Sequence, residues 1–202
     1  MKHLKTMGLA ALAAIAVLAF LTAGTASATE LYSGATTLKS GTAIKASLSG
    51  SATLTTTEGT VLDTCAGGEV NGNSTNNGGP DVPVKGAITA LTWTNCTEPT
   101  KTLRLANLEI YWTSGLNGTV VAANNSEGKS TEVTVNTTFF GSCVFTMPDG
   151  KIIGTLTGST TTNATFDINA TANRVSGLCP STAKWVGTYK VTSPSPLHVT
   201  AS

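Results

Sequence analysis

Apolar and polar residues alternate with a period of two along most of the chain. In residues 44–54, Ile, Ala and Leu occupy one parity, while Lys, Ser and Thr occupy the other. The same alternation recurs in residues 82–90, 132–136 and 164–173. A period of two places the apolar side chains on one face of a β-strand, whereas a helix needs a period of about 3.6. The pattern therefore predicts strands with one buried and one solvated face.

Turn residues separate these segments. Asn117-Gly118, residues 124–128 and residues 148–150 combine Asn, Asp, Gly and Pro between strand-like runs, which predicts hairpins. Further strands are predicted at residues 185–192 and 197–200, on either side of two prolines.

Two stretches interrupt the alternation. The apolar parity changes between Leu105 and Leu108, which predicts a β-bulge near Ala106-Asn107. Residues 66–80 are rich in Gly and Asn and poor in apolar side chains, which predicts a long irregular loop.

About ten short strands with short connections predict an all-β fold. We expect an antiparallel β-sandwich with two disulfides, and a β-barrel is the alternative. Thr, Ser, Asn and Gly make up 89 of the 202 residues, and Thr suits the solvated face of a strand. Only 11% of the residues are charged, against about 25% in an average soluble domain, which argues against helical bundles and charged disordered tails.

Residues 1–28 have the pattern of a secretory signal peptide. Two lysines precede an uncharged apolar run, and Ala26-Ser27-Ala28 matches the small-residue cleavage pattern. The apolar run is shorter than the roughly 20 residues that a membrane span needs. We therefore predict a helical signal peptide, a single mature domain over residues 29–202 without a membrane span, and secretion to the extracellular space or cell surface.

All four cysteines lie in the predicted mature region, which indicates disulfides in a secreted chain. Three pairings exist. We favour Cys65–Cys96 and Cys143–Cys179, because sequential pairing closes loops of moderate length, 31 and 36 residues apart. No two cysteines have the close spacing of a zinc site, so we predict no metal and no cofactor.

Residues suited to catalysis are few. His198 is the only imidazole of the predicted mature chain, and its alternation with apolar neighbours near the chain end points it to solvent. Glu109 and Asp167 also alternate with core positions, which places them on a solvated strand face. We predict that the protein is not an enzyme and has no catalytic residue. A secreted hydrolase that uses His198, Glu109 or Asp167 is an alternative.

Tyr111 is the candidate for a ligand platform. Adjacent strand residues face opposite sides, and Trp112 shares the parity of Leu108 and Ile110, so Tyr111 falls on the outer face with Glu109. An exposed aromatic ring in a Thr- and Asn-rich sheet is suited to binding sugars, and a carbohydrate-binding module is therefore an alternative function.

Three acidic residues lie within or beside the Gly- and Asn-rich stretch, namely Asp63, Glu69 and Asp81. Oxygen ligands at close spacing can bind calcium, but the order of acidic residues in a known calcium loop is absent. We favour a solvated loop, with a calcium site as the alternative.

Several segments resemble a group of secreted, four-cysteine, β-rich proteins of actinobacteria and their relatives. They are Leu62-Asp63-Thr64-Cys65, residues 91–97 (LTWTNCT), Cys179-Pro180 and residues 194–197 (PSPL). No activity is assigned to that group, so the resemblance transfers no functional residue.

The favoured function is a secreted, non-catalytic extracellular or cell-surface protein with a structural or binding role. Low charge, disulfides and many strands suit persistence outside the cell. The net charge of +1 provides no basic surface for nucleic acid. Candidate partners are a cell-envelope polysaccharide or a surface protein.

Overall fold

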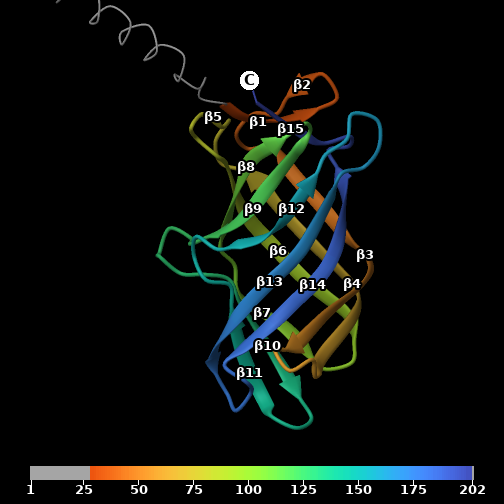
Figure 1. Cartoon of the computed structure of the whole chain (residues 1–202), viewed down its shortest axis with the longest axis vertical. Coiled ribbons are helices and arrows are strands. Elements are labelled where there is room, and N and C mark those ends of the chain that lie inside the picture. Colours follow the sequence, from red (N-terminus) through yellow and green to blue (C-terminus); the bar gives the residue numbers. More distant parts are fainter. Residues whose placement is uncertain (1–27, 202) are drawn as a thin grey trace, which may run out of the picture.

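The computed structural model describes residues 28–201, which form fifteen β-strands and no helix (Figure 1). This confirms the all-β prediction, with more strands than the ten expected. Except for Ala28, which begins the first strand, the predicted signal peptide lies outside the described residues. The strands are β1 (Ala28–Ser33), β2 (Thr36–Thr37), β3 (Ala43–Thr56), β4 (Val61–Ser74), β5 (Gly79–Pro80), β6 (Val84–Cys96), β7 (Thr100–Arg104), β8 (Asn107–Ser114), β9 (Asn117–Ala123), β10 (Glu132–Thr137), β11 (Gly141–Thr146), β12 (Ile152–Thr157), β13 (Thr165–Ser176), β14 (Thr182–Ser193) and β15 (His198–Ala201).

Eight of the strands close into an antiparallel barrel. Their order around it is β12, β9, β8, β6, β4, β3, β14 and β13, and the pairing of β13 with β12 completes the circle. The structure thus has the alternative architecture, a barrel, in place of the predicted sandwich. Alternation indicates which face of a strand is buried, and both architectures bury one face. Closure depends instead on β12 pairing with both β9 and β13, a long-range feature.

The barrel wall divides into an upper and a lower part along its length. The first half of β13 pairs with β12, and its last residues pair with β11. From β11 the sheet continues through β10 to β7. We call β8, β9 and β12 the upper wall, and β7, β10 and β11 the lower wall (Figure 1).

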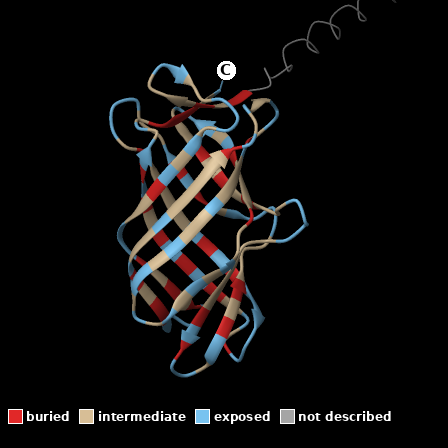
Figure 2. Ribbon diagram, turned by 180° about the vertical axis from the view of Figure 1, so that it is seen from behind, coloured by how far each residue is buried: buried red, intermediate tan, exposed pale blue. Residues whose placement is uncertain are grey.

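The predicted bulge near Ala106-Asn107 is a break between these two walls. Strand β7 ends at Arg104 and pairs with β10, whereas β8 begins at Asn107 and pairs with β6 and β9. The change of apolar parity therefore marks a change of partner strands. Buried and exposed residues alternate along the barrel strands, as the period of two predicts (Figure 2).

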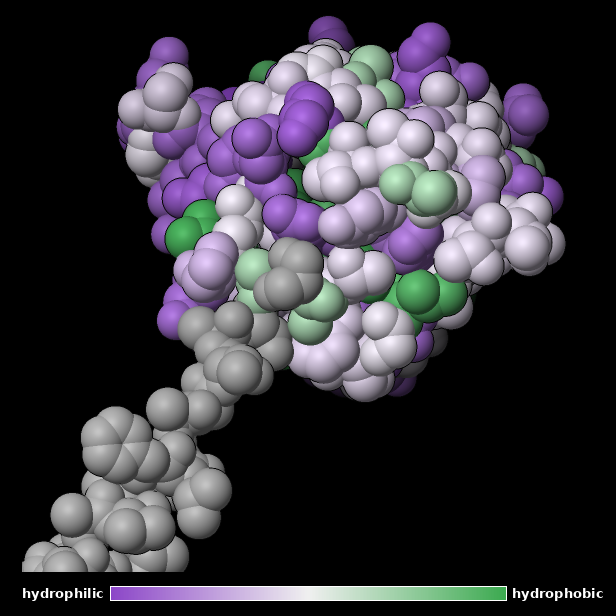
Figure 3. All heavy atoms as spheres, turned by 90° about the horizontal axis from the view of Figure 1, so that it is seen from above, coloured by the Kyte–Doolittle hydropathy of each residue, from purple (hydrophilic) through white to green (hydrophobic). Residues whose placement is uncertain are grey.

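A second small sheet lies across the upper end of the barrel (Figure 1). This cap consists of β1 paired with β2, β5 and β15. Leu31 and Val199 of the cap, together with Leu197 just before β15, are at most 1% exposed and join the core cluster of the upper barrel. Viewed from above, the end of the molecule is mostly polar or neutral, with scattered hydrophobic residues (Figure 3).

Both predicted disulfides are present, Cys65–Cys96 and Cys143–Cys179. The first joins paired positions of the neighbouring strands β4 and β6. The second joins β11 of the lower wall to the connection between β13 and β14. The two bridges therefore hold opposite parts of the lower barrel.

The Gly- and Asn-rich stretch over residues 66–80 is mostly strand, so the prediction of an irregular loop is wrong. Strand β4 continues to Ser74 and pairs with β6 from Cys65 to Ser74. Its glycines allow close contact with β6, because a Cβ atom at Gly72 would lie 2.6 Å from the carbonyl oxygen of Ala87. Glycine here indicates close strand approach instead of a loop.

Candidate functional site

The barrel interior holds an apolar cavity of about 140 Å³. All eight barrel strands contribute inward-facing side chains to its lining, and β10 and β11 of the lower wall add to them. The cavity therefore lies where the upper and lower walls meet. A smaller hollow of about 50 Å³, bordered by Leu31 of the cap, shares part of this lining.

Large inward-facing side chains around the cavity are only half-buried. Val70, Leu108, Phe166 and Ile168 all line the cavity and retain some accessible surface. They belong to strand faces that point into the barrel, so this surface faces interior space. Small residues such as Ala122 and Ala172 occupy other positions of the lining. The mixture of small and large side chains leaves room that a close-packed core would fill.

Two tryptophans meet at the cavity. The rings of Trp93 on β6 and Trp185 on β14 contact each other edge to face, with their centres 4.4 Å apart. The indole N–H of Trp93 donates to Thr102 Oγ1 at 3.2 Å, and that hydroxyl donates to the Leu91 carbonyl at 2.7 Å. These bonds tie β7 to β6 and so close the lower barrel beside the cavity.

The cavity lining includes few polar groups, and three of them are already bonded. Asn107 donates to the Asn124 carbonyl, Thr146 donates to the Thr131 carbonyl, and the Thr131 hydroxyl accepts from the amide of Ala106. These bonds lie at the junction of the upper and lower walls. They hold the two walls together there without placing a free charge in the cavity.

The Tyr189 hydroxyl differs from these groups. Tyr189 lines the cavity and is 3% exposed, and its hydroxyl has no hydrogen-bond partner among the described residues. Burial raises the pKa of this hydroxyl far above its ordinary value, and the nearby Trp185 side chain opposes the shift only in part. The group is therefore a neutral, protonated donor that faces an apolar cavity.

The raised pKa of Tyr189 predicts a loss of stability at alkaline pH. The unfolded chain releases this proton above about pH 10, whereas the folded protein keeps it. The free energy of unfolding is therefore unaffected below that pH and falls as pH rises above it. Urea unfolding between pH 8 and 11 should show a shallower fall for Tyr189→Phe than for the wild type. If the free energy of unfolding fell equally with pH in the two proteins, the raised pKa of Tyr189 would be contradicted.

Tyr111 also contributes to the loss of stability at alkaline pH, and a control variant can separate its contribution from that of Tyr189. Its hydroxyl donates to Glu109 Oε2 at 2.7 Å, and this bond, together with slight burial, raises the pKa of Tyr111. The Tyr111→Phe variant should remove only this contribution, because the ring lies on the outer face of the barrel.

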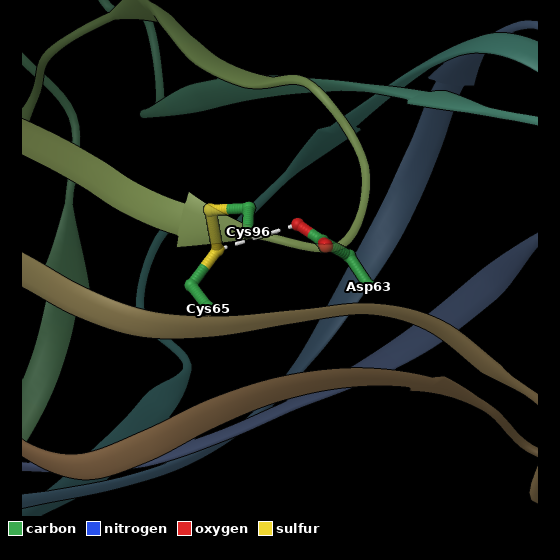
Figure 4. Close-up of side chains that lie close together, drawn as sticks. All are labelled: Asp63, Cys65 and Cys96. Atoms are coloured by element: carbon green, nitrogen blue, oxygen red, sulfur yellow. Dashed lines mark hydrogen bonds between the residues drawn. A yellow bond between two sulfur atoms is a disulfide. The ribbon is translucent and has the colours of Figure 1, made fainter.

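A buried carboxylate lies beside the Cys65–Cys96 disulfide (Figure 4). Asp63 is 1% exposed, and one of its oxygens is 3.4 Å from Cys65 Sγ. Among residues 28–201, Asp63, Cys65 and Cys96 form the one cluster of three side chains with metal-ligand atoms close together. The two sulfurs are bonded to each other, so neither is a thiolate that could bind a metal.

The alternative calcium ligands do not come together. Asp63 is directed toward residues 97–100, where it accepts hydrogen bonds from Thr97 and the Glu98 amide. Glu69 and Asp81 are absent from the cluster that contains Asp63. The strand structure of β4 explains this, because it separates residues that a flexible loop could have gathered.

Among the described residues, no hydrogen bond or ion pair joins Glu109, Asp167 and His198 to one another; Glu109 and Asp167 have other partners. Tyr111 is 40% exposed on β8, beside Glu109, whose carboxylate also pairs with Lys85 at 3.4 Å. Asp167 accepts hydrogen bonds from Thr165 and Thr188. As a sugar platform, Tyr111 stays a prediction.

The expectation that His198 points to solvent is wrong. It is 5% exposed, and its ring stacks on Tyr32 with centres 5.6 Å apart. Strand β15 pairs with β1 in the cap, and Gly158 lies so close to His198 that a Cβ atom there would be 2.8 Å from the His198 Cα. An end strand covered on both faces buries consecutive residues, which alternation alone does not reveal.

Sequence reasoning missed the cavity and Tyr189. One signal was present, because Tyr189 shares the parity of Trp185 and Val191, both of which are buried. That parity predicts an inward phenol, but the interior space depends on how eight strands close.

Comparisons of the chain with protein-family models, curated proteins and solved structures found no match. Among the described residues, no helix is long and apolar enough to cross a membrane.

Proposed function

We propose that the chain is a secreted, non-catalytic binding protein that holds a small apolar molecule inside its barrel. The observation that carries this proposal is the apolar cavity between the upper and lower walls. A barrel of eight strands has an interior of the size that either side chains or one small ligand can fill. Here the small side chains of the lining favour a ligand.

The chemistry of the lining favours binding over catalysis. The described residues of the lining include no Asp, Glu, His, Lys, Arg or Cys, and Tyr189 stays protonated. General acid–base or nucleophilic catalysis needs such groups within reach of the ligand. The two disulfides favour a compartment outside the cytoplasm.

The entrance we propose is the junction between the two walls. Strands β7 and β8 do not pair with each other, and neither do β11 and β12. Lining residues Ala123, Thr131 and Met147 lie at this junction, beside the connection of residues 124–131 that projects from the barrel (Figure 1). The cap closes the upper end, so a side entrance suits this fold.

Filling the cavity tests the proposal. Val70→Trp adds a large side chain to the lining, whereas Glu69→Trp places the same side chain on the exposed face of the same strand. Titration with toluene, followed by the backbone amide signals in NMR, should show saturable binding to the wild type and to Glu69→Trp. We expect at least tenfold weaker binding by Val70→Trp.

Circular dichroism of each variant provides the control for folding. The proposal fails if folded wild-type protein does not bind toluene saturably. It also fails if a folded Val70→Trp variant binds toluene as tightly as Glu69→Trp does.

A further inference from the structure

We infer that the cavity takes an uncharged molecule the size of a monosubstituted benzene, with one hydrogen-bond acceptor that binds the Tyr189 hydroxyl. This inference rests on the proposed function and specifies the chemistry of its ligand. It combines the volume of the cavity, the absence of charge from its described lining, and a buried donor without a partner.

The volume sets the size of the ligand. The cavity measures about 140 Å³, and an engineered apolar cavity of about 150 Å³ in another protein takes benzene. The contact between Trp93 and Trp185 limits the space between β6 and β14. A single ring with a short substituent fits these dimensions, whereas a long acyl chain does not.

The lining sets the charge of the ligand. No described lining residue carries a charge, so a bound carboxylate or ammonium group would lose its hydration without gaining an ion pair. Transfer of an unpaired charge into an apolar site is strongly unfavourable. The ligand is therefore neutral.

Tyr189 determines which functional group the ligand carries. Its hydroxyl is buried without a partner among the described residues, and burial keeps it protonated. A buried donor without an acceptor is unfavourable, and a ligand oxygen removes that cost. A buried water needs two to four polar partners, and the described lining is mostly apolar beside Tyr189.

Three molecules of nearly equal shape test the requirement for a hydrogen-bond acceptor and the requirement for neutrality separately. Acetophenone carries a neutral carbonyl acceptor, α-methylstyrene replaces that oxygen with a methylene group, and benzoate carries a charged acceptor. We expect calorimetry at pH 7 to show acetophenone binding about tenfold more tightly than α-methylstyrene. Benzoate should bind at least tenfold more weakly than acetophenone.

The Tyr189→Phe variant removes the donor and keeps the ring. The preference for acetophenone over α-methylstyrene should fall at least about tenfold in this variant, because the buried carbonyl then gains no hydrogen bond in exchange for those it loses to water. Tyr111→Phe is the matched control: it makes the same change on the exposed face of β8, and should keep the full preference for acetophenone.

The outcomes distinguish this inference from the proposed function. If the wild type binds acetophenone and α-methylstyrene equally, or if folded Tyr189→Phe keeps the preference, the role of Tyr189 is overturned while binding in the barrel stands. Benzoate binding as tight as that of acetophenone overturns the requirement for neutrality. If folded wild type binds none of the three, the proposed function itself fails. Should Tyr189→Phe not fold, the wild-type comparison of the two neutral molecules still decides.

Discussion

Replacing Asp63 with alanine is expected to lower the free energy of unfolding by about 3–4 kcal/mol. The buried carboxylate accepts from Thr97 Oγ1 at 2.9 Å, from the Glu98 amide at 3.0 Å, and from Thr100 Oγ1. Hydrogen bonds to a charged group contribute about 1.5–3 kcal/mol each. Because the desolvation of Asp63 itself offsets part of the total, the net loss is smaller than the sum.

Thr97 and Glu98 lie in the connection between β6 and β7, and Thr100 is the first residue of β7. Asp63 therefore fixes the point at which the chain leaves the barrel for the lower wall. We expect the Asp63→Ala variant to show faster hydrogen exchange in β7 and in β10, its partner strand.

Asp149→Ala is the control for Asp63→Ala. Asp149 accepts one hydrogen bond, from the Asn124 amide at 2.8 Å, at an exposed site. Its replacement should cost no more than about 1 kcal/mol. Urea unfolding followed by tryptophan fluorescence measures both variants. If Asp63→Ala lowered the free energy of unfolding as little as Asp149→Ala does, the buried carboxylate would contribute little to stability.

The strand faces could be predicted from the sequence because they depend on local alternation. Ala46, Ala52 and Leu54 are buried on β3 as their parity indicates, and the same holds for Ala170 and Ala172 on β13. The disulfide pairing could be predicted as well, since both bridges join cysteines that are successive in the chain.

Features that depend on distant strands could not be predicted in this way. The barrel closes because β12 pairs with β13 as well as β9, and no local pattern distinguishes this from a sandwich. His198 is buried because β15 returns to β1, far away in sequence. The change of parity near Ala106 was visible, but its cause is the division of the wall into two parts.

The candidate site shows the same division between local and distant information. Residues such as Phe166 and Ile168 could be assigned to an inward face from their alternation. The space between them and Leu108 results from the curvature of the closed sheet and from the separation of the upper and lower walls. A predicted inward tyrosine becomes a binding group only where such a space lies in front of it.

Removing the Cys143–Cys179 disulfide by a double replacement with alanine is expected to cost about 4 kcal/mol. Both cysteines are fully buried, and alanine leaves no unpaired polar group there. The bridge spans 36 residues, and loop-closure entropy for that length produces the estimate. It is also the covalent link between the lower wall and β13–β14.

The matched comparison is a double alanine replacement at Cys65 and Cys96. That bridge spans 31 residues, so loop closure alone predicts nearly the same loss of about 4 kcal/mol. The two variants should differ in which strands become more dynamic. Cys65 and Cys96 lie at paired positions of neighbouring strands, so hydrogen bonds still hold them together. Cys143 and Cys179 are not paired in the sheet. Hydrogen exchange should accelerate in β10 and β11 only when Cys143–Cys179 is removed.

The same variant also tests how the lower wall contributes to ligand binding. Val133, Val135 and Phe145 line the cavity from β10 and β11. If these strands loosen, toluene binding should weaken in the Cys143→Ala/Cys179→Ala variant more than in the Cys65→Ala/Cys96→Ala variant. Equal exchange rates in β10 and β11 for the two variants would mean that strand pairing, without the bridge, holds this side of the cavity in place.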